Sequence, residues 1–347
     1  MSRRSPIHEQ HVALGAKLTD FGGWEMPLSY PTGTLEEVRA CRTGAAVFDV
    51  SHLGTVRVEG PGALDRLQVA LTNDLGKIAP GRAQYTHLLD ESGGVLDDII
   101  VWWLADEVFD VMPNASNTER VRAAIGGVDT TASRCILALQ GPQARLIAAK
   151  LSADFAAVER FHVRTVNWHG VGIVVAGTGY TGEDGIELAV PATAAADLLA
   201  ALVVQGAVPA GLGARDVLRL EAGLPLHGHE LSPDITPLEA RLNWVLAWDK
   251  PNFVGKHALE TQRAAGIPRQ LLGLRSNDRQ PLREHADVYV GDEMVGQTSS
   301  GGYSPTLDSG IALAFLSPGL SPGAAVSIDL RGRRKDATVV KPPFIHR

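Results

Sequence analysis

Cysteine is nearly absent from this chain of 347 residues: only Cys41 and Cys135 occur, far apart in the sequence. Without a CxxC pair, neither a disulfide framework nor a cysteine-ligated zinc site is indicated. A cysteine content this low is typical of proteins that work in a reducing compartment. We therefore expect a cytoplasmic protein.

Long apolar runs and an excess of positive charge are also lacking. No stretch approaches the roughly 18 uninterrupted apolar residues of a membrane-spanning helix, and residues 1–15 lack the apolar core of a secretory signal. The net charge of −7 argues against a general nucleic-acid surface. One basic run, RGRRK at 331–335, lies between strand-like segments, which favours a hairpin tip over a docking patch for an acidic partner. We expect neither a membrane nor a nucleic acid as partner.

The chain does contain many short periodic segments, and their character changes near residue 270. Before it, helical and strand patterns mix without regular βαβ alternation, which indicates an α+β region. After it, six short strand-like segments separated by turn residues follow without a helix, as in a small closed β-domain. We place a boundary at 265–271. Helical patterns are expected at 35–43, 62–71, 117–126, 141–151 and 193–206.

The segment GTGYTG at 177–182 matches the glycine pattern of dinucleotide-binding proteins and follows a strand-like segment. That motif binds a pyrophosphate only where its third glycine opens a helix. The residues that follow alternate as in a strand, so a nucleotide site is not expected here. Two interpretations remain: a glycine-rich hairpin that brings Tyr180 close to something flat, or simply a tight turn.

Two adjacent carboxylates, Asp97 and Asp98, stand where the apolar run 99–103 begins. Because alternate residues of a strand share a face, only one of the two can point into any one cavity. Asp97 suits the capping of the preceding Gly-Gly turn. Asp98 lies one residue deeper and is open to either a structural or a functional role.

A third carboxylate, Glu221, lies in the segment GARDVLRLEAG at 213–223. At helical spacing it shares the apolar face, where a carboxylate needs a partner. Glu221 either forms a structural ion pair with Arg215 or Arg219, or accepts hydrogen bonds from N–H groups of a pterin-like or purine-like ligand. The histidines show no metal-ligand spacing, so no metal site is expected.

Nine segments, spread in order over nearly the whole chain, match a known family. They are FGGWEMPLSY (21–30), FDVSHLG (48–54), ESGGVLDDIIV (91–101), GYTGEDGIEL (179–188), GARDVLRLEAGLPLHG (213–228), TPLEARLNWVL (236–246), FVGKHAL (253–259), TSSGGYSPTLDSGIALAF (298–315) and KPPFIHR (341–347). Together they resemble the glycine cleavage system T-protein, or aminomethyltransferase, family.

The resemblance implies an α+β fold of three domains around a central folate-binding channel, with a C-terminal all-β barrel. On this division, residues 1–270 form the folate-binding region and residues 271–347 form the barrel. The folate-binding region would consist of two interleaved domains, about 1–50 plus 130–270, and 51–129.

The resemblance also implies a reaction. The lipoyl arm of the H-protein would deliver an aminomethyl group on sulfur, tetrahydrofolate would take the methylene as cosubstrate, and ammonia would leave. A folate-dependent demethylase acting on a sulfur, nitrogen or oxygen donor would use the same pocket motifs. A folate-binding iron–sulfur assembly factor is a third possibility, against which the absence of cysteine after Cys135 argues.

Carried over residue by residue, the catalytic position of the family falls on Asp98, which would orient the folate and stabilise the positive charge that develops as ammonia departs. The pterin-binding glutamate falls on Glu221. Lys250 stands where some members carry arginine, so it keeps the charge but loses the bidentate fork, and His227 stands where members often carry tyrosine. The remaining folate-binding positions are Tyr85, Met112, Asn114, Tyr180, Lys250 and Arg347.

Overall fold

The computed structural model describes residues 2–346, which form two compact units. Unit 1 comprises residues 2–88 and 97–215, and unit 2 comprises residues 89–96 and 216–346. The chain passes between them at the turn between β6 (Arg82–Leu89) and β7 (Val95–Ala105), and again within α8 (Leu212–Glu221). Residues 216–270 therefore group with the barrel, whereas the division into three domains stays a prediction.

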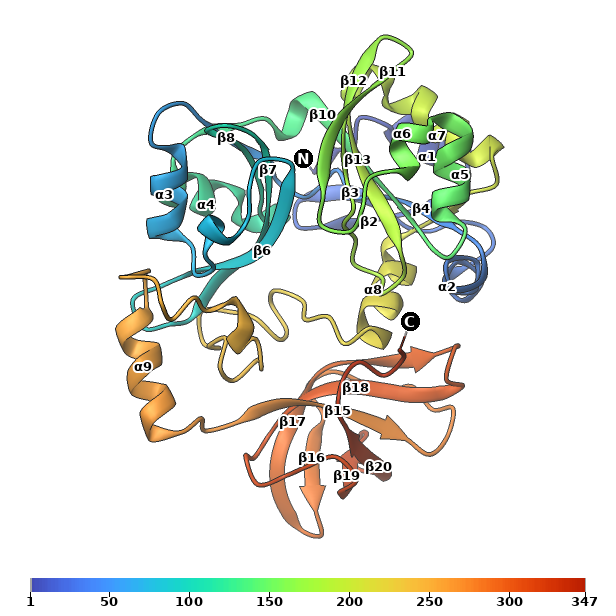
Figure 1. Ribbon diagram of the computed structural model, residues 1–347. Coiled ribbons are helices and arrows are strands. Elements are labelled where there is room, and N and C mark those ends of the chain that lie inside the picture. Colours follow the sequence, from blue (N-terminus) through green and yellow to red (C-terminus); the bar gives the residue numbers. More distant parts are fainter. Residues whose placement is uncertain (1, 347) are drawn as a thin grey trace. The chain divides into compact units, whose positions relative to one another are not determined.

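Unit 1 contains a six-stranded sheet with the order β11-β12-β13-β10-β4-β14 (Figure 1). In it, β14 pairs parallel with β4 and the other neighbours pair antiparallel. Apolar side chains of the helices α5, α6 and α7 pack on this sheet, and the apolar run of β10 is buried along its whole length. The bounds are β4 (Ala46–Asp49), β10 (Arg134–Gln140), β11 (Val163–Trp168), β12 (Val171–Ala176), β13 (Gly185–Pro191), β14 (Val208–Ala210), α5 (Ala144–Leu151), α6 (Ala153–Ala156) and α7 (Ala195–Val204).

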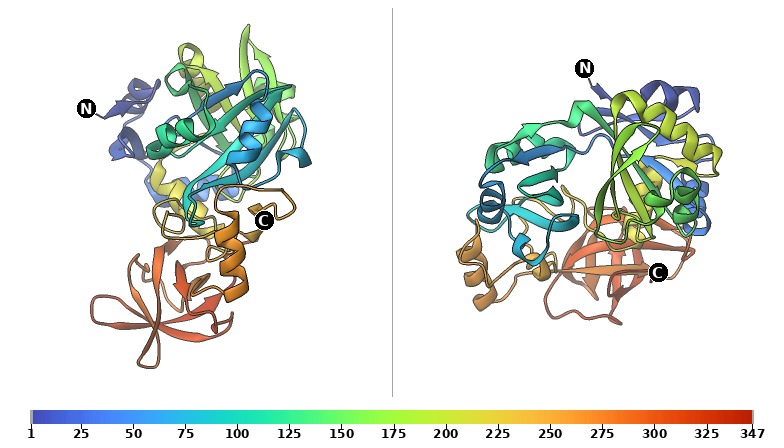
Figure 2. Two further views of the ribbon diagram at one scale, coloured as in Figure 1. Left: turned by 90° about the vertical axis from the view of Figure 1, so that its left-hand side faces the viewer. Right: turned by 45° about the horizontal axis from the view of Figure 1, so that its top comes forward.

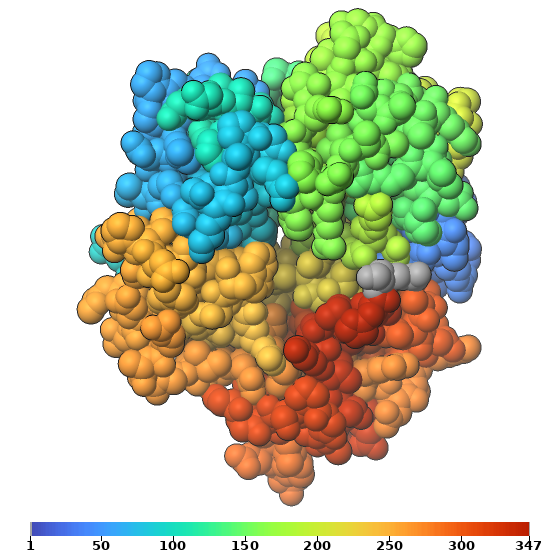
Figure 3. Space-filling model, in the orientation of Figure 1, coloured from blue at the N-terminus to red at the C-terminus, as the bar shows by residue number. Residues whose placement is uncertain are grey.

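A five-stranded sheet with the order β6-β7-β8-β5-β9 forms the second lobe of unit 1. In the space-filling view, this lobe (blue to cyan) and the six-stranded lobe (green) lie side by side (Figure 3). They meet where Arg82, at the start of β6, forms an isolated bridge with His162. The bounds are β5 (Val56–Glu59), β8 (Val108–Met112), β9 (Val128–Asp129), α3 (Ala63–Ala70) and α4 (Thr118–Ile125).

The N-terminal part of unit 1 adds a three-stranded sheet with the order β1-β3-β2 and two helices. The longer helix, α2, ends at Thr43, as the pattern at 35–43 predicted, and Gly44 is its C-cap. The bounds are β1 (Arg3–Arg4), α1 (His8–Ala13), β2 (Lys17–Phe21), β3 (Trp24–Ser29) and α2 (Thr34–Thr43). Short 3-10 helices are η1 (Leu75–Lys77), η2 (Ala115–Asn117), η3 (Thr131–Ser133), η4 (Ala192–Ala194) and η5 (Asn243–Val245).

Unit 2 contains α9 (Lys256–Ala265) and a closed barrel with the order β15-β18-β17-β16-β19-β20, seen from two further directions in Figure 2. Pairing of β15 with β20 closes it around an aliphatic core. The prediction of six strands is confirmed, and the basic run 331–335 lies at the turn between β19 and β20, as expected for a hairpin tip. The bounds are β15 (Gln270–Ser276), β16 (Asp287–Val290), β17 (Glu293–Ser304), β18 (Ser309–Leu316), β19 (Ala325–Asp329) and β20 (Arg334–Val340).

The five predicted helices correspond to α2, α3, α4, α5 and α7, with bounds that differ by a few residues. The glycine-rich segment 177–182 leads into the strand β13 and not into a helix, which confirms that it is no dinucleotide motif. Within residues 2–346, no helix is both long enough and apolar enough to cross a bilayer.

Candidate active site

Three neighbouring strands of unit 1 bring together Asp98, Tyr85 and Asn114, three residues predicted to belong to one site. Asp98 lies on β7, Tyr85 on β6 and Asn114 two residues after β8. The Tyr85 hydroxyl donates to Asp98 Oδ2 at 3.0 Å, and Asn114 Nδ2 donates to Asp98 Oδ1 at 2.8 Å. Each carboxylate oxygen of the predicted catalytic residue is thus held by a hydrogen-bond donor.

His87 extends this arrangement by one residue. It lies on the same face of β6 as Tyr85, is fully buried, and its Nε2 is 3.2 Å from the Tyr85 hydroxyl. Because the one hydroxyl hydrogen of Tyr85 is donated to Asp98, Nε2 is the donor in its contact with Tyr85. Burial and then the negative charge of Asp98 raise the pKa of Tyr85 well above its usual value, so the phenol keeps that hydrogen.

Asp97 points to the opposite, fully buried side of β7. Its carboxylate accepts from Asn117 Nδ2 at 2.7 Å, from Asn114 Nδ2 at 2.8 Å and from the Asn114 backbone N–H at 3.1 Å. One hydrogen of the Asn114 amide therefore goes to each of the two carboxylates. Asp98, one residue further along the strand, is the more exposed of the pair.

The Gly-Gly turn before β7 has a different cap. Asp90 Oδ1 accepts from the backbone N–H of Ser92 at 2.9 Å and of Gly94 at 3.0 Å. The prediction that Asp97 caps this turn is therefore wrong. Asp97 is already within the strand and faces the buried amides, whereas Asp90 begins the turn and reaches its N–H groups.

The two adjacent carboxylates do not titrate alike. Burial and then the charge of Asp98 raise the pKa of Asp97 to about 8, against the opposing effect of the Asn114 and Asn117 amides. Two like charges this close are costly in a buried site, so one of the pair retains its proton. The raised pKa therefore favours a proton on Asp97 near neutral pH.

Tyr180 lies in the loop between β12 and β13, with the Arg215 guanidinium 4.9 Å from its ring centre. Its phenol is close enough to contribute to the raised pKa of Tyr85. Met112, at the end of β8, is buried, and its sulfur accepts from the Thr55 hydroxyl at 3.2 Å. These predicted residues also belong to unit 1.

Glu221 is the last residue of α8 and is fully buried in unit 2, as the helical spacing predicted. Its Oε1 accepts from the Ser304 hydroxyl at 2.5 Å and from the Thr306 N–H at 3.4 Å. Arg219, one of the two arginines considered as its partner, instead pairs with Asp216 at 2.8 Å and with Glu230 at 3.0 Å.

Lys250 is also in unit 2 and is buried, with its Nζ 5.9 Å from the ring centre of Phe253. Its carbonyl oxygen accepts from Lys256 Nζ at 2.6 Å. Arg347, predicted to contact the folate tail, lies outside the described residues.

Sequence reasoning missed two residues of this site. His87 follows Tyr85 by two positions in the same strand, so strand alternation could have placed it beside the phenol. Asn117 gives no such signal, because only the turn after β8 brings its amide to Asp97.

A carboxylate fixed by two hydrogen-bond donors is suited to stabilising positive charge. The site is therefore that of an enzyme whose reaction develops positive charge, on a fold with a mixed helix-and-sheet region and a terminal barrel. Models of two sequence families match the chain: the GCVT N-terminal domain over residues 7–250, and the glycine cleavage T-protein C-terminal barrel domain over residues 269–346. The chain belongs to the glycine cleavage T-protein family.

Individual relatives support the same family. An aminomethyltransferase of Parafrankia sp. is 46% identical over 361 residues, covering 99% of this chain and 98% of that protein. One of Mycobacterium tuberculosis is 46% identical over 354 residues, covering 98% and 96%. The crystal structure of the glycine cleavage system aminomethyltransferase T from Bartonella henselae matches with a TM-score of 0.93 and 34% identity, covering 99% and 98%. The predicted family, the α+β fold with its barrel, and the class of one-carbon transferase are confirmed.

Proposed function

We propose that the chain transfers the methylene of a lipoyl-bound aminomethyl group from the H-protein to tetrahydrofolate, with release of ammonia, in glycine catabolism. The observation that carries the proposal is the Asp98 carboxylate, held between the Tyr85 hydroxyl and the Asn114 amide. The relatives named above support it, since they are aminomethyltransferases and one belongs to the glycine cleavage system. We place the reaction in the cytoplasm, in keeping with the low cysteine content.

In this proposal Asp98 supplies the negative charge that the reaction needs. Positive charge develops on the one-carbon unit as ammonia leaves, and a carboxylate that is already fixed stabilises it without reorganisation. Tyr85 and Asn114 hold the two oxygens of Asp98 in place. Asp97 keeps its own proton near neutral pH and orients Asn114, so the charge stays at the position that faces the substrate.

Glu221 would bind the pterin, as the family resemblance implies. Glu221 is a buried carboxylate with one oxygen held by Ser304, and a carboxylate can accept further N–H groups such as the pterin N3 and 2-amino hydrogens. Tyr180 and Met112 would line the folate, and Lys250 and Arg347 would meet its tail.

The three-domain division is part of the same proposal. The three-stranded and six-stranded sheets fall within 1–50 plus 130–270, and the five-stranded sheet falls within 51–129. The barrel strands fall within 271–347 except for the first residue of β15. Each sheet therefore stays inside one proposed domain, which supports the division.

The decisive assay supplies tetrahydrofolate and aminomethylated H-protein to the purified protein. We expect equal amounts of ammonia and methylenetetrahydrofolate. A demethylase on the same fold would instead give no ammonia with a competent H-protein and would form methyltetrahydrofolate from a methyl donor, and that result would overturn the proposal.

A further inference from the structure

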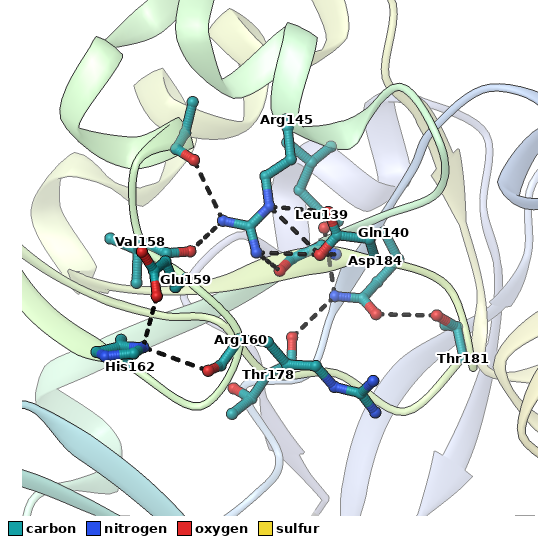
Figure 4. Close-up of polar contacts among 12 residues, drawn as sticks. Leu139, Gln140, Arg145, Val158, Glu159, Arg160, His162, Thr178, Thr181 and Asp184 are labelled. Atoms are coloured by element: carbon teal, nitrogen blue, oxygen red, sulfur yellow. Dashed lines mark hydrogen bonds and ion pairs between the residues drawn. The ribbon is translucent and has the colours of Figure 1, made fainter. Parts of the chain in front are cut away.

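One buried amide, that of Gln140, holds the glycine-rich loop that carries Tyr180. Gln140 is the last residue of β10 and is fully buried. Its Nε2 donates to the carbonyl oxygen of Thr178 at 3.1 Å, and its Oε1 accepts from the hydroxyl of Thr181 at 2.9 Å (Figure 4). The amide therefore joins the two residues that flank Gly179 and Tyr180, and it fixes the turn between them.

Two glycines, Gly179 in the loop and Gly185 at the start of β13, leave the space that the amide occupies. A Cβ on Gly179 would lie 1.9 Å from Gln140 Oε1, and one on Gly185 would lie 2.5 Å from Gln140 Nε2. Neither contact is possible for a side-chain carbon. The glycine pattern that resembles a nucleotide motif thus allows the loop to wrap closely around a side chain of the neighbouring strand.

Two arginines fix the loop after Thr181. Arg42 Nη1 donates to the carbonyl oxygen of Thr181 and to Glu183 Oε1, both at 2.8 Å. Arg145, on α5, donates from Nη2 to Asp184 Oδ1 and to the carbonyl oxygen of Gly185, both at 3.0 Å (Figure 4). The loop is therefore tied to the body of unit 1 at both ends and in the middle.

The held residue, Tyr180, lies beside the candidate active site. The Arg215 guanidinium lies 4.9 Å from its ring centre, and its phenol is near enough to Tyr85 to affect the pKa of that residue. An aromatic ring fixed before a ligand arrives loses little conformational freedom on binding, which favours affinity.

We propose that Gln140 is a positioning residue for folate binding, which acts by fixing Tyr180 as a flat wall for the pterin ring. This inference rests on the proposed function. Gln140 itself is fully buried beneath the loop, so its effect reaches the ligand only through Tyr180.

The test compares Gln140→Met, which keeps the length of the side chain and removes both hydrogen bonds, with the wild type. Amide hydrogen exchange in 177–184 should become at least about 10-fold faster, while exchange in β10 and β13 stays unchanged. The Kd for tetrahydrofolate should rise about 3- to 10-fold, because the Tyr180 side chain would then have to be ordered on binding. In a Tyr180→Ala background, Gln140→Met should add no further rise.

Thr181→Val removes one of the two bonds to the amide at nearly constant volume and should give the same pattern with smaller changes. It replaces Gln140→Met in the test if that variant fails to fold. An unchanged Kd despite faster loop exchange would overturn the inference, as would an equal rise in Kd in the Tyr180→Ala background. A wild type that does not bind tetrahydrofolate would overturn the proposed function itself, so the two failures are distinguishable.

Discussion

At the scale of single residues, the direction of one hydrogen decides how well Asp98 is stabilised. With a hydrogen on His87 Nε2, that nitrogen donates to the Tyr85 oxygen, and the single hydroxyl hydrogen of Tyr85 is left for Asp98. An unprotonated Nε2 would instead compete with Asp98 for that hydrogen. The row from His87 through Tyr85 to Asp98 therefore behaves as a set of dependent hydrogen bonds rather than as separate contacts.

A matched pair of variants at His87 tests this dependence. His87→Gln retains an N–H donor near the position of Nε2, whereas His87→Met has a similar length and no donor. We expect His87→Met to lower kcat about 3- to 10-fold, which corresponds to the free energy of one lost hydrogen bond. We expect His87→Gln to retain most of the activity. Equal loss in both variants would show that His87 serves only as packing.

The protonation of Asp97 predicts how stability depends on pH. Its pKa in the folded protein, about 8, lies above the ordinary value of an aspartate, so the native state binds more protons than the unfolded state between about pH 4 and pH 8. The stability gained from this proton is complete below about pH 4 and is lost as pH rises through 8.

Asp97→Asn should remove that dependence. Over pH 5 to 8 the free energy of unfolding of the wild type should fall relative to the variant, by at most about 1.4 kcal/mol per pH unit, which corresponds to one proton. Denaturant unfolding at several pH values measures the difference. Parallel curves for the two proteins would contradict a protonated Asp97.

At the scale of elements, the C-terminal half of α8 is tied to the barrel by one buried arginine. Arg219 pairs with the fully buried Glu230 at 3.0 Å and donates to the hydroxyl of Ser300, on β17, at 2.8 Å. A buried ion pair is weak support in itself, but removal of one partner leaves an uncompensated charge.

Arg219→Met should therefore destabilise the protein by about 3–5 kcal/mol, because Glu230 would remain buried without this cation. The double variant Arg219→Met/Glu230→Gln, which removes both charges, should recover part of the loss. Thermal and denaturant unfolding of the three proteins measure this. A double variant no more stable than the single one would show that the cost lies in lost packing.

At the scale of the whole molecule, sequence patterns predicted the elements and their order well. The apolar run of β10 and the six short strands of the barrel are local signals, set by alternation and by turn residues. The hydrogen-bond partners of Asp97 and Asp98 could not be predicted in the same way. They depend on which strands are neighbours, and the β6-β7-β8 order that brings Tyr85 and Asn114 to Asp98 is not a local property of the sequence.

Family resemblance supplied what periodicity could not, because it assigned a role to Asp98 where alternation only separated it from Asp97. It also named Tyr85 and Asn114, but as folate-binding positions and not as the partners of Asp98. His87, Asn117 and Gln140 act through side-chain contacts across strands and loops, and only the structure brings them to their partners.

The central claim is that Asp98, and not its neighbour, carries the charge used in transfer. Single-turnover release of ammonia from aminomethylated H-protein, in the presence of tetrahydrofolate, tests it most directly in the wild type, Asp98→Asn and Asp97→Asn. We expect Asp98→Asn to lower the rate by about 10²- to 10³-fold while the fold and much of the tetrahydrofolate binding are retained, and Asp97→Asn to lower it by less than about 10-fold. A wild-type rate in Asp98→Asn, or a greater loss in Asp97→Asn, would contradict the account.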